Sequence, residues 1–116
     1  MLLDLPAPIS VNRMRRVDWK ARKNALSWRE MADKFLEAAM TRGEVQRARL
    51  ARYELQITLS EQHCRIDADN GLKLLIDYLR YAEIVLDDSK KNLRRIVVEW
   101  GHAPAGCRVL IKPMEG

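Results

Sequence analysis

Residues 53–82 read YELQITLSEQHCRIDADNGLKLLIDYLRYA, and this stretch contains both kinds of regular structure on which the fold depends. Over residues 53–60, apolar and polar side chains alternate strictly, which is the pattern of a half-buried β-strand. Over residues 72–82, apolar side chains recur every three or four positions, as they do on one face of an amphipathic helix. Asp69 and Asn70 are favoured N-cap residues and mark the expected start of this helix. The stretch therefore predicts a strand followed by a helix.

The residues before this stretch predict another strand and another helix. Residues 2–5 are mostly apolar and predict a short strand that ends before Pro6. Ser27 and Glu30 have the spacing of a capping box, in which each side chain bonds to the other residue's backbone N–H. We therefore expect a helix that begins at Ser27 and ends near Gly43, a favoured C-cap residue.

The residues after this stretch predict two more strands. Residues 93–100 are rich in β-branched side chains, and residues 107–112 form a second strand-like run after a turn that contains two glycines and a proline. The expected order is β-α-β-α-β-β. It predicts a single small domain over residues 1–116, of α/β (α+β) class, with a mixed or antiparallel sheet packed with two helices.

The composition excludes several classes of protein. With 116 residues, 47% of them apolar and 6% aromatic, the chain fits one soluble globular domain. The apolar runs are too short to cross a bilayer, so we expect no membrane association. Two cysteines, Cys64 and Cys107, cannot make a disulfide framework, and no signal-peptide pattern opens the chain. These features predict a cytoplasmic protein.

Charge is distributed unevenly along the chain. The formal net charge is +5, and residues 1–53 carry 12 Lys and Arg against 6 Asp and Glu. A basic excess of this kind predicts a polyanion as the partner. Residues 67–88 are the opposite, because they hold six acidic residues against two basic ones. The negative charge of this segment requires compensation by another group.

The acids of this segment predict a divalent-cation site. Asp67 and Asp69 lie at the start of the expected helix, where the helix dipole favours anions. Asp87 and Asp88 follow the other end of the helix, where the dipole disfavours them, so they need another reason to be there. Hard cations such as Mg²⁺ bind carboxylate oxygens and keep positions open for water and phosphate. We therefore expect Mg²⁺, with Mn²⁺ as a substitute, and no small-molecule cofactor.

The acidic motif resembles that of the RusA family of Holliday junction resolvases, small Mg²⁺-dependent endonucleases often carried by phages and prophages. In this chain the motif reads Asp67-x-Asp69-Asn70-x-x-Lys73-x-x-x-Asp77-x-Leu79, followed by Asp87-Asp88. The opening segment is also similar to that family's, and reads Leu5-Pro6-x-Pro8-x-Ser10-x-Asn12-Arg13. Together with a matching order of elements, the resemblance covers nearly the full chain.

The resemblance implies a catalytic centre and a reaction. Asp67, Asp69 and Asp88 match the family's three catalytic aspartates, with Asp87 as a neighbouring metal ligand, and Lys73 matches a lysine needed for cleavage. The carboxylates would hold the ion, which lowers the pKa of a bound water and polarises the phosphate, and Lys73 would offer positive charge to the transition state. The implied outcome is paired nicks with 5′-phosphate ends, in DNA recombination and repair. Two equivalent scissile strands in a junction predict a C₂ homodimer.

Two residues of the motif also have ordinary structural interpretations. Lys73 has the i,i+4 spacing of a helix-surface ion pair with Asp69 or with Asp77, which is worth about 0.2–0.5 kcal/mol. Asp77 is expected to pair with Arg80 or Lys73 rather than to bind the metal ion. The neighbouring acids favour a functional role for Lys73.

Basic side chains outside the motif are candidate DNA contacts. Members of the family carry a longer arginine-rich approach to the first aspartate, whereas this chain offers only residues 63–66. We therefore expect contacts from an N-terminal basic run and from a basic group after the acids, although charge runs also occur on solvated surfaces. The candidates are Arg13, Arg15, Arg16, Lys20, Arg22, Lys23, Arg65, Lys90 and Lys91, with Arg94 and Arg95 in the second group.

The sequence as a whole predicts a Mg²⁺-dependent endonuclease that acts on branched DNA as a homodimer. His63, Cys64, His102 and Cys107 lack the spacing of a zinc site. Two alternatives stay open. One is a flap or fork nuclease with the same chemistry, and the other is a non-catalytic DNA-binding relative in which the acids are structural.

Overall fold

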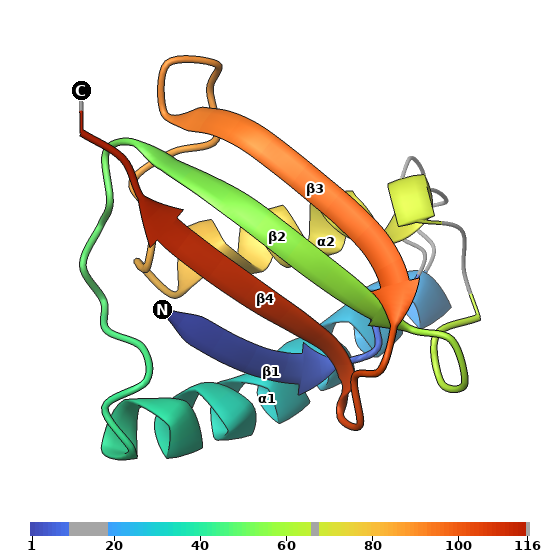
Figure 1. The fold of residues 1–116 in the computed structure, drawn as a ribbon. Coiled ribbons are helices and arrows are strands. Elements are labelled where there is room, and N and C mark those ends of the chain that lie inside the picture. The colour runs from blue at the N-terminus through green and yellow to red at the C-terminus, as the bar shows by residue number, and fades with distance from the viewer. Residues whose placement is uncertain (10–18, 66–67, 116) are drawn as a thin grey trace.

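A four-stranded sheet and two helices make up the fold of this protein in a computed structural model that describes residues 1–9, 19–65 and 68–115. In two stretches of these ranges, 19–22 and 68–70, and at residue 25, only the backbone is described. The elements follow in the order β-α-β-α-β-β, which confirms the predicted fold class (Figure 1). They are β1 (Leu2–Pro6), α1 (Trp19–Thr41), β2 (Tyr53–Ser60), α2 (Ala68–Tyr81), β3 (Leu93–Gly101) and β4 (Gly106–Pro113).

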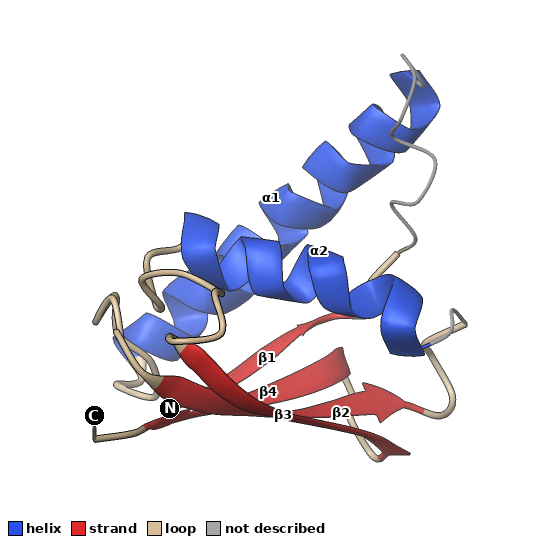
Figure 2. Ribbon diagram, turned by 90° about the horizontal axis from the view of Figure 1, so that it is seen from above, coloured by secondary structure: helices blue, strands red, loops and turns tan. Residues whose placement is uncertain are grey.

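The sheet is mixed, with the strand order β1-β4-β2-β3. β2 is parallel to β3, and β4 is antiparallel to both β1 and β2. Parallel neighbours require a crossover connection, and α2 supplies it between β2 and β3. Figure 2 shows both helices on the same face of the sheet, so no helix of the described residues covers the other face.

The core lies between the sheet and the helices. Tyr53, Leu55, Ile57 and Leu59 of β2 are all buried, as the alternation in the sequence predicts. The helices contribute buried side chains at the predicted spacing, including Leu75 and Leu79 of α2. Burying a side chain of this size contributes about 1.5–3 kcal/mol before entropy is counted.

The first helix is longer than the sequence predicted. The expectation that it begins at Ser27 is wrong, because α1 begins at Trp19 and Ser27 is an exposed residue inside it. Residues 20–26 contain no glycine or proline and are mostly good helix formers, so nothing stops the helix from extending backwards. Ser27 and Glu30 have the residue types and spacing of a capping box, but they lie inside the helix and not at its N-terminus. The second helix also begins slightly earlier than expected, at Ala68.

The residues at the C-terminal ends of α1 and β1 explain where these two elements stop. α1 ends at Thr41, and the predicted C-cap residue Gly43 follows it with φ +75°. The N–H of Gly43 donates to the Met40 carbonyl and that of Glu44 to the Ala39 carbonyl, the two bonds of a Schellman motif. β1 extends one residue further than predicted, to Pro6, which an edge strand tolerates.

The strand boundaries of β3 and β4 agree with the prediction within a residue at each end. Among the described residues, no helix is both long enough and apolar enough to cross a membrane.

Gly106 gives a test of the packing where β4 meets the chain after β1. It has φ +131°, and an added Cβ would lie 2.1 Å from the backbone nitrogen of Ala7. We expect Gly106→Ala to lower the free energy of unfolding by about 3 kcal/mol or more, since backbone must move to relieve the clash. Chemical denaturation followed by circular dichroism measures this change.

Gly43→Ala is the matched control. It also places a Cβ at a positive φ, but φ +75° is close to the left-handed region that other residues adopt, and the Cβ meets no atom within 4 Å, so it should cost only about 1–2 kcal/mol. Equal losses in the two variants would contradict the close approach of Gly106 to Ala7.

Candidate metal and DNA-binding site

α2 positions the acidic motif at one end of the sheet. The helix begins at Ala68, so Asp69 lies in its first turn and Asp67 immediately precedes it. Asp67 lies outside the described residues, as does the side chain of Asp69. The body of the helix is held firmly, because Tyr78 donates a hydrogen bond of 2.8 Å to Asp33 and packs edge-on against Trp28 at 5.5 Å.

Residues 60–64, at the end of β2 and just after it, form a tight turn. The Ser60 hydroxyl accepts hydrogen bonds from the backbone N–H groups of Gln62 (3.2 Å) and His63 (3.0 Å). The N–H of Cys64 donates to the Ser60 carbonyl, and Cys64 is buried. The short approach to the acidic motif is therefore anchored to the sheet up to Cys64, while Arg65 is exposed.

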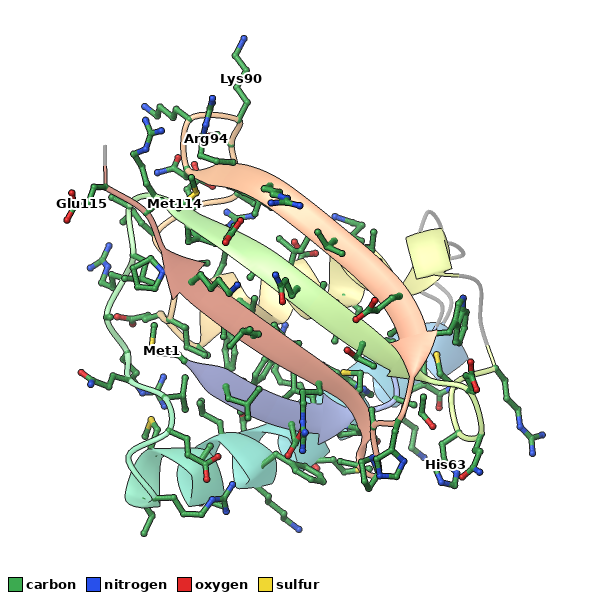
Figure 3. All side chains as sticks on the ribbon, in the orientation of Figure 1. Met1, His63, Lys90, Arg94, Met114 and Glu115 are labelled. Carbon is green, nitrogen blue, oxygen red and sulfur yellow. The ribbon has the colours of Figure 1, made fainter. Side chains whose placement is uncertain are left out.

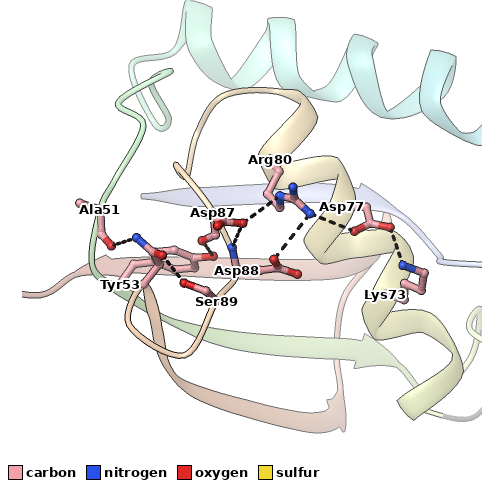
Figure 4. Close-up of polar contacts among 9 residues, drawn as sticks. Ala51, Tyr53, Lys73, Asp77, Arg80, Asp87, Asp88 and Ser89 are labelled. Carbon is pink, nitrogen blue, oxygen red and sulfur yellow. Dashed lines mark hydrogen bonds and ion pairs between the residues drawn. The ribbon is translucent and has the colours of Figure 1, made fainter.

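The second acidic pair lies beside the C-terminal half of α2 (Figure 4). Arg80 extends from the helix between the acids, with its Nε 3.6 Å from Asp87 Oδ1 and its Nη1 3.5 Å from Asp88 Oδ1. The same Nη1 lies 3.9 Å from Asp77 Oδ1. One guanidinium thus compensates part of the negative charge of three carboxylates, which reduces the repulsion among these acids.

Two buried polar groups hold the loop that carries this pair. Tyr53 donates a 2.8 Å hydrogen bond to the Asp87 carbonyl, and Asn92 Nδ2 donates a 2.6 Å bond to the Ala51 carbonyl. The Tyr53 N–H also donates to the Asn92 carbonyl. Burial, and then the nearby charges of Asp88 and Asp87, raise the pKa of the Tyr53 hydroxyl to about 12. The start of β2 therefore fixes the acidic loop.

Lys73 lies on the exposed surface of α2. Its ammonium nitrogen is 3.3 Å from Asp77 Oδ2, and its side chain is 72% exposed. Asp77 is thus paired with both Lys73 and Arg80, which confirms its predicted place as a helix-face partner.

The two groups of acids are separated along α2. The helix rises about 1.5 Å per residue, so the backbone of Asp69 lies about 12 Å from that of Asp77 along the axis. Asp88 is level with Asp77 and Arg80 through their ion pairs. Within the described ranges, no three His, Cys, Asp or Glu side chains gather closely enough to hold a metal ion. Because Asp67 and the Asp69 side chain are not included, convergence of the three aspartates stays a prediction.

The candidate DNA contacts lie on different parts of the molecule. Figure 3 shows Lys90 and Arg94 near the start of β3 and His63 near the opposite end of the sheet. Lys23, Arg65, Lys90 and Lys91 are exposed. Arg13, Arg15 and Arg16 lie outside the described residues, and so do the side chains of Lys20 and Arg22.

The four residues considered for zinc do not form a zinc site. His63 and His102 line one cavity of about 260 Å³, whereas Cys64 and Cys107 are buried. Burial raises the pKa of the Cys107 thiol to about 12, which disfavours the thiolate that metal ions bind.

Sequence reasoning missed the position of Arg80 between Asp87 and Asp88. Its i,i+3 spacing from Asp77 was visible, but the return of residues 87–88 to the same helix face depends on the loop and on Tyr53.

In comparisons with known proteins, the chain matches no family model and no curated protein.

The hydrogen bond from Tyr53 to the acidic loop predicts a pH dependence. The folded-state pKa of about 12 lies above the usual value of 10, so the neutral hydroxyl stabilises the fold below pH 10. This contribution is lost as the pH rises from about 10 to about 12. Tyr53→Phe should therefore be less stable than wild type by about 1 kcal/mol at pH 8, because it lacks the hydrogen bond, and the difference should shrink above pH 10.

Urea unfolding at a series of pH values from 8 to 11 measures this difference. Tyr81→Phe is the control, because Tyr81 is 52% exposed and its hydroxyl bonds to no described residue. A constant gap between wild type and Tyr53→Phe across the series would show that Tyr53 does not contribute in this way.

Proposed function

We propose that this protein is a Mg²⁺-dependent endodeoxyribonuclease of the cytoplasm that resolves four-way DNA junctions by paired phosphodiester hydrolysis. The observation that carries the proposal is the acidic motif at the start of α2, with exposed Lys73 one turn further along the helix. The four-way junction is inferred as the substrate from the resemblance of this motif to the RusA family.

The donor set fits Mg²⁺. Asp67, Asp69 and Asp88 offer carboxylate oxygens, which are the hard ligands that this ion prefers. The Asp88 side chain is 38% exposed, so a cation from solvent has access to it. When bound, Mg²⁺ supplies the Lewis acid that withdraws charge from the scissile phosphate.

Lys73 would stabilise the negative charge that develops on the phosphate. Its pairing with Asp77 is a surface ion pair of about 0.2–0.5 kcal/mol, which a phosphate oxygen can replace at little cost. The ammonium group would then donate hydrogen bonds to the non-bridging oxygens in the transition state.

Asp88 requires a further explanation, because it lies level with Asp77 rather than with the start of α2. Two arrangements join it to the Asp69 end: a shift of its loop, or a site in which a second protomer supplies Asp88. Mixing the Asp69→Asn and Asp88→Asn proteins separates them. Restored nicking identifies a site shared between protomers, and absence of nicking identifies a site within one chain.

We expect Asp69→Asn to reduce cleavage of a four-way junction more than about 100-fold. Mutating a residue that only hydrogen-bonds to a metal ligand lowers activity by about 10–100-fold, and loss of the ligand itself should lower it further. Junction binding should be unchanged or stronger, since a negative charge that repels phosphate has been removed. Asp67→Asn and Asp88→Asn should behave alike. Gel assays of cleavage and binding on labelled junctions measure both effects.

Asp77→Asn is the matched control, because it removes one carboxylate from the same helix at a position paired with Lys73 and Arg80. It should retain most of the activity. Full Mg²⁺-dependent cutting by Asp69→Asn would exclude Asp69 as a ligand.

The proposal includes a homodimer, and β3 is the candidate interface. This strand is an edge of the sheet, and its Ile96 and Trp100 are 40% and 44% exposed. Exposed apolar edge strands are normally covered. Light scattering at micromolar concentration should give twice the 13.5 kDa mass of the chain.

Ile96→Glu should shift the protein towards the mass of one chain. Met31→Glu, which changes an apolar residue on α1 that is 50% exposed, should not. A wild-type protein that stays at 13.5 kDa would contradict the dimer.

A second candidate function is DNA binding without catalysis. The pairing of Arg80 with Asp77, Asp87 and Asp88 favours it, because those acids are partly compensated without a metal ion. This alternative predicts junction binding that neither Mg²⁺ nor Asp69→Asn changes.

A further inference from the structure

A groove on the side of the molecule that carries α1 has no part in the acidic motif. It lies between α1, β1 and the turn that joins β3 to β4, and it has a volume of about 400 Å³. This is within the range of about 300–1,000 Å³ found for ligand pockets. Figure 1 shows that α1 and β1, which form two of its walls, lie side by side.

The walls of the groove carry more positive than negative charge. Lys34 of α1, Arg42 just after α1 and Arg108 of β4 line it together with Asp4, and Glu44 pairs with Arg42, so three cations stand against two carboxylates. Lys34 is exposed and makes no hydrogen bond or ion pair with any described residue. The net charge therefore favours an anionic ligand.

Two of these cations are held in place with donors to spare. Arg108 donates to Asp4 through Nε (2.8 Å) and Nη2 (3.4 Å). Arg42 donates to Glu44 through the same two nitrogens, at 2.6 and 3.4 Å. A guanidinium has five N–H donors, so each arginine keeps its Nη1 group for a ligand. Fixed donors of this kind lose little entropy when an anion binds.

The remainder of the groove is apolar. Phe35, Ala38, Pro104 and Ala105 line it. Phe35 is half-buried and packs against the core, so its ring is supported from behind. A flat apolar ring with an anionic group attached would satisfy both parts of this lining, and a nucleotide has both. Aromatic side chains beside a positive groove are the usual means of binding unpaired bases.

The groove is also continuous with the approach to the acidic motif. Pro104 lines both this groove and the neighbouring cavity that contains His63 and His102. His63 belongs to the turn that leads to Asp67. A DNA strand that leaves the acidic motif along this turn would therefore reach the groove by crossing Pro104.

We propose that this groove binds one unpaired nucleotide of a DNA single strand, with the base on Phe35 and Pro104 and the phosphate on Lys34, Arg42 and Arg108. This inference rests on the proposal that the partner is DNA. Branch points expose unpaired or unstacked nucleotides, so a groove of this kind gives a reason for selecting branched over linear DNA.

Fluorescence anisotropy with a labelled 12-nucleotide single strand tests the proposal. The full chain is titrated in EDTA, so the result does not depend on cleavage. We expect Lys34→Ala to weaken binding at least threefold, whereas Lys112→Ala, which removes the same charge from the β4 surface, should change it less than twofold.

Ala38→Phe tests the shape of the groove without changing its charge. Ala38 is exposed on α1, so this variant should fold normally and should bind the single strand at least threefold more weakly. Ala48→Phe, at an exposed position outside the groove, is the control. An abasic strand of equal length should bind wild type at least fivefold more weakly than the strand with bases, and Ala38→Phe should not weaken it further.

Two results would overturn the inference: equal affinity of wild type for the abasic and normal strands, or wild-type affinity in both Lys34→Ala and Ala38→Phe. Junction cleavage measured in parallel keeps this test separate from the proposed function. Loss of affinity in the groove variants without any cleavage would reject the nuclease and retain the groove. Cleavage with unchanged affinity in the variants would do the reverse.

Discussion

The pairing of β2 on both sides is the constraint on which the rest of the structure depends. β2 is antiparallel to β4 and parallel to β3, and the parallel pairing forces α2 to return across the sheet. The start of β2 holds the loop with Asp87 and Asp88, and the end of β2 holds the turn over residues 60–64. Tyr53 bonds to the Asp87 carbonyl at the start of β2, and Ser60 anchors the turn that leads to Asp67 at its end.

Much of the fold could be predicted because its elements have strong periodicity. The alternation of β2 and the apolar stripe of α2 each depend on burial of one face, and the structure buries those faces. The start of α1 could not be predicted in the same way. Ser27 and Glu30 have the composition of a helix cap, but helix formers before them extend the helix to Trp19.

Less of the candidate site could be predicted, because it depends on contacts between distant residues. Lys73 and Asp77 were recognisable as neighbours, since helix geometry alone brings them together. Arg80 contacts Asp87 and Asp88 because the loop that carries them, which is bonded to Tyr53, lies beside α2, and no local pattern in the sequence predicts this. The groove is harder still to predict from the sequence, because its walls come from β1, α1, β4 and a turn, and no local sequence pattern connects them.

We propose that the acidic motif at the start of α2 makes this protein a junction-selective nuclease. The most direct measurement incubates the purified chain with a labelled four-way junction, a fork, a flap and a linear duplex, each with and without Mg²⁺. We expect symmetric nicks in the four-way junction that require Mg²⁺, less cutting of the fork and flap than of the four-way junction, and no cutting of the duplex. Binding of the junction without any Mg²⁺-dependent cutting would contradict it.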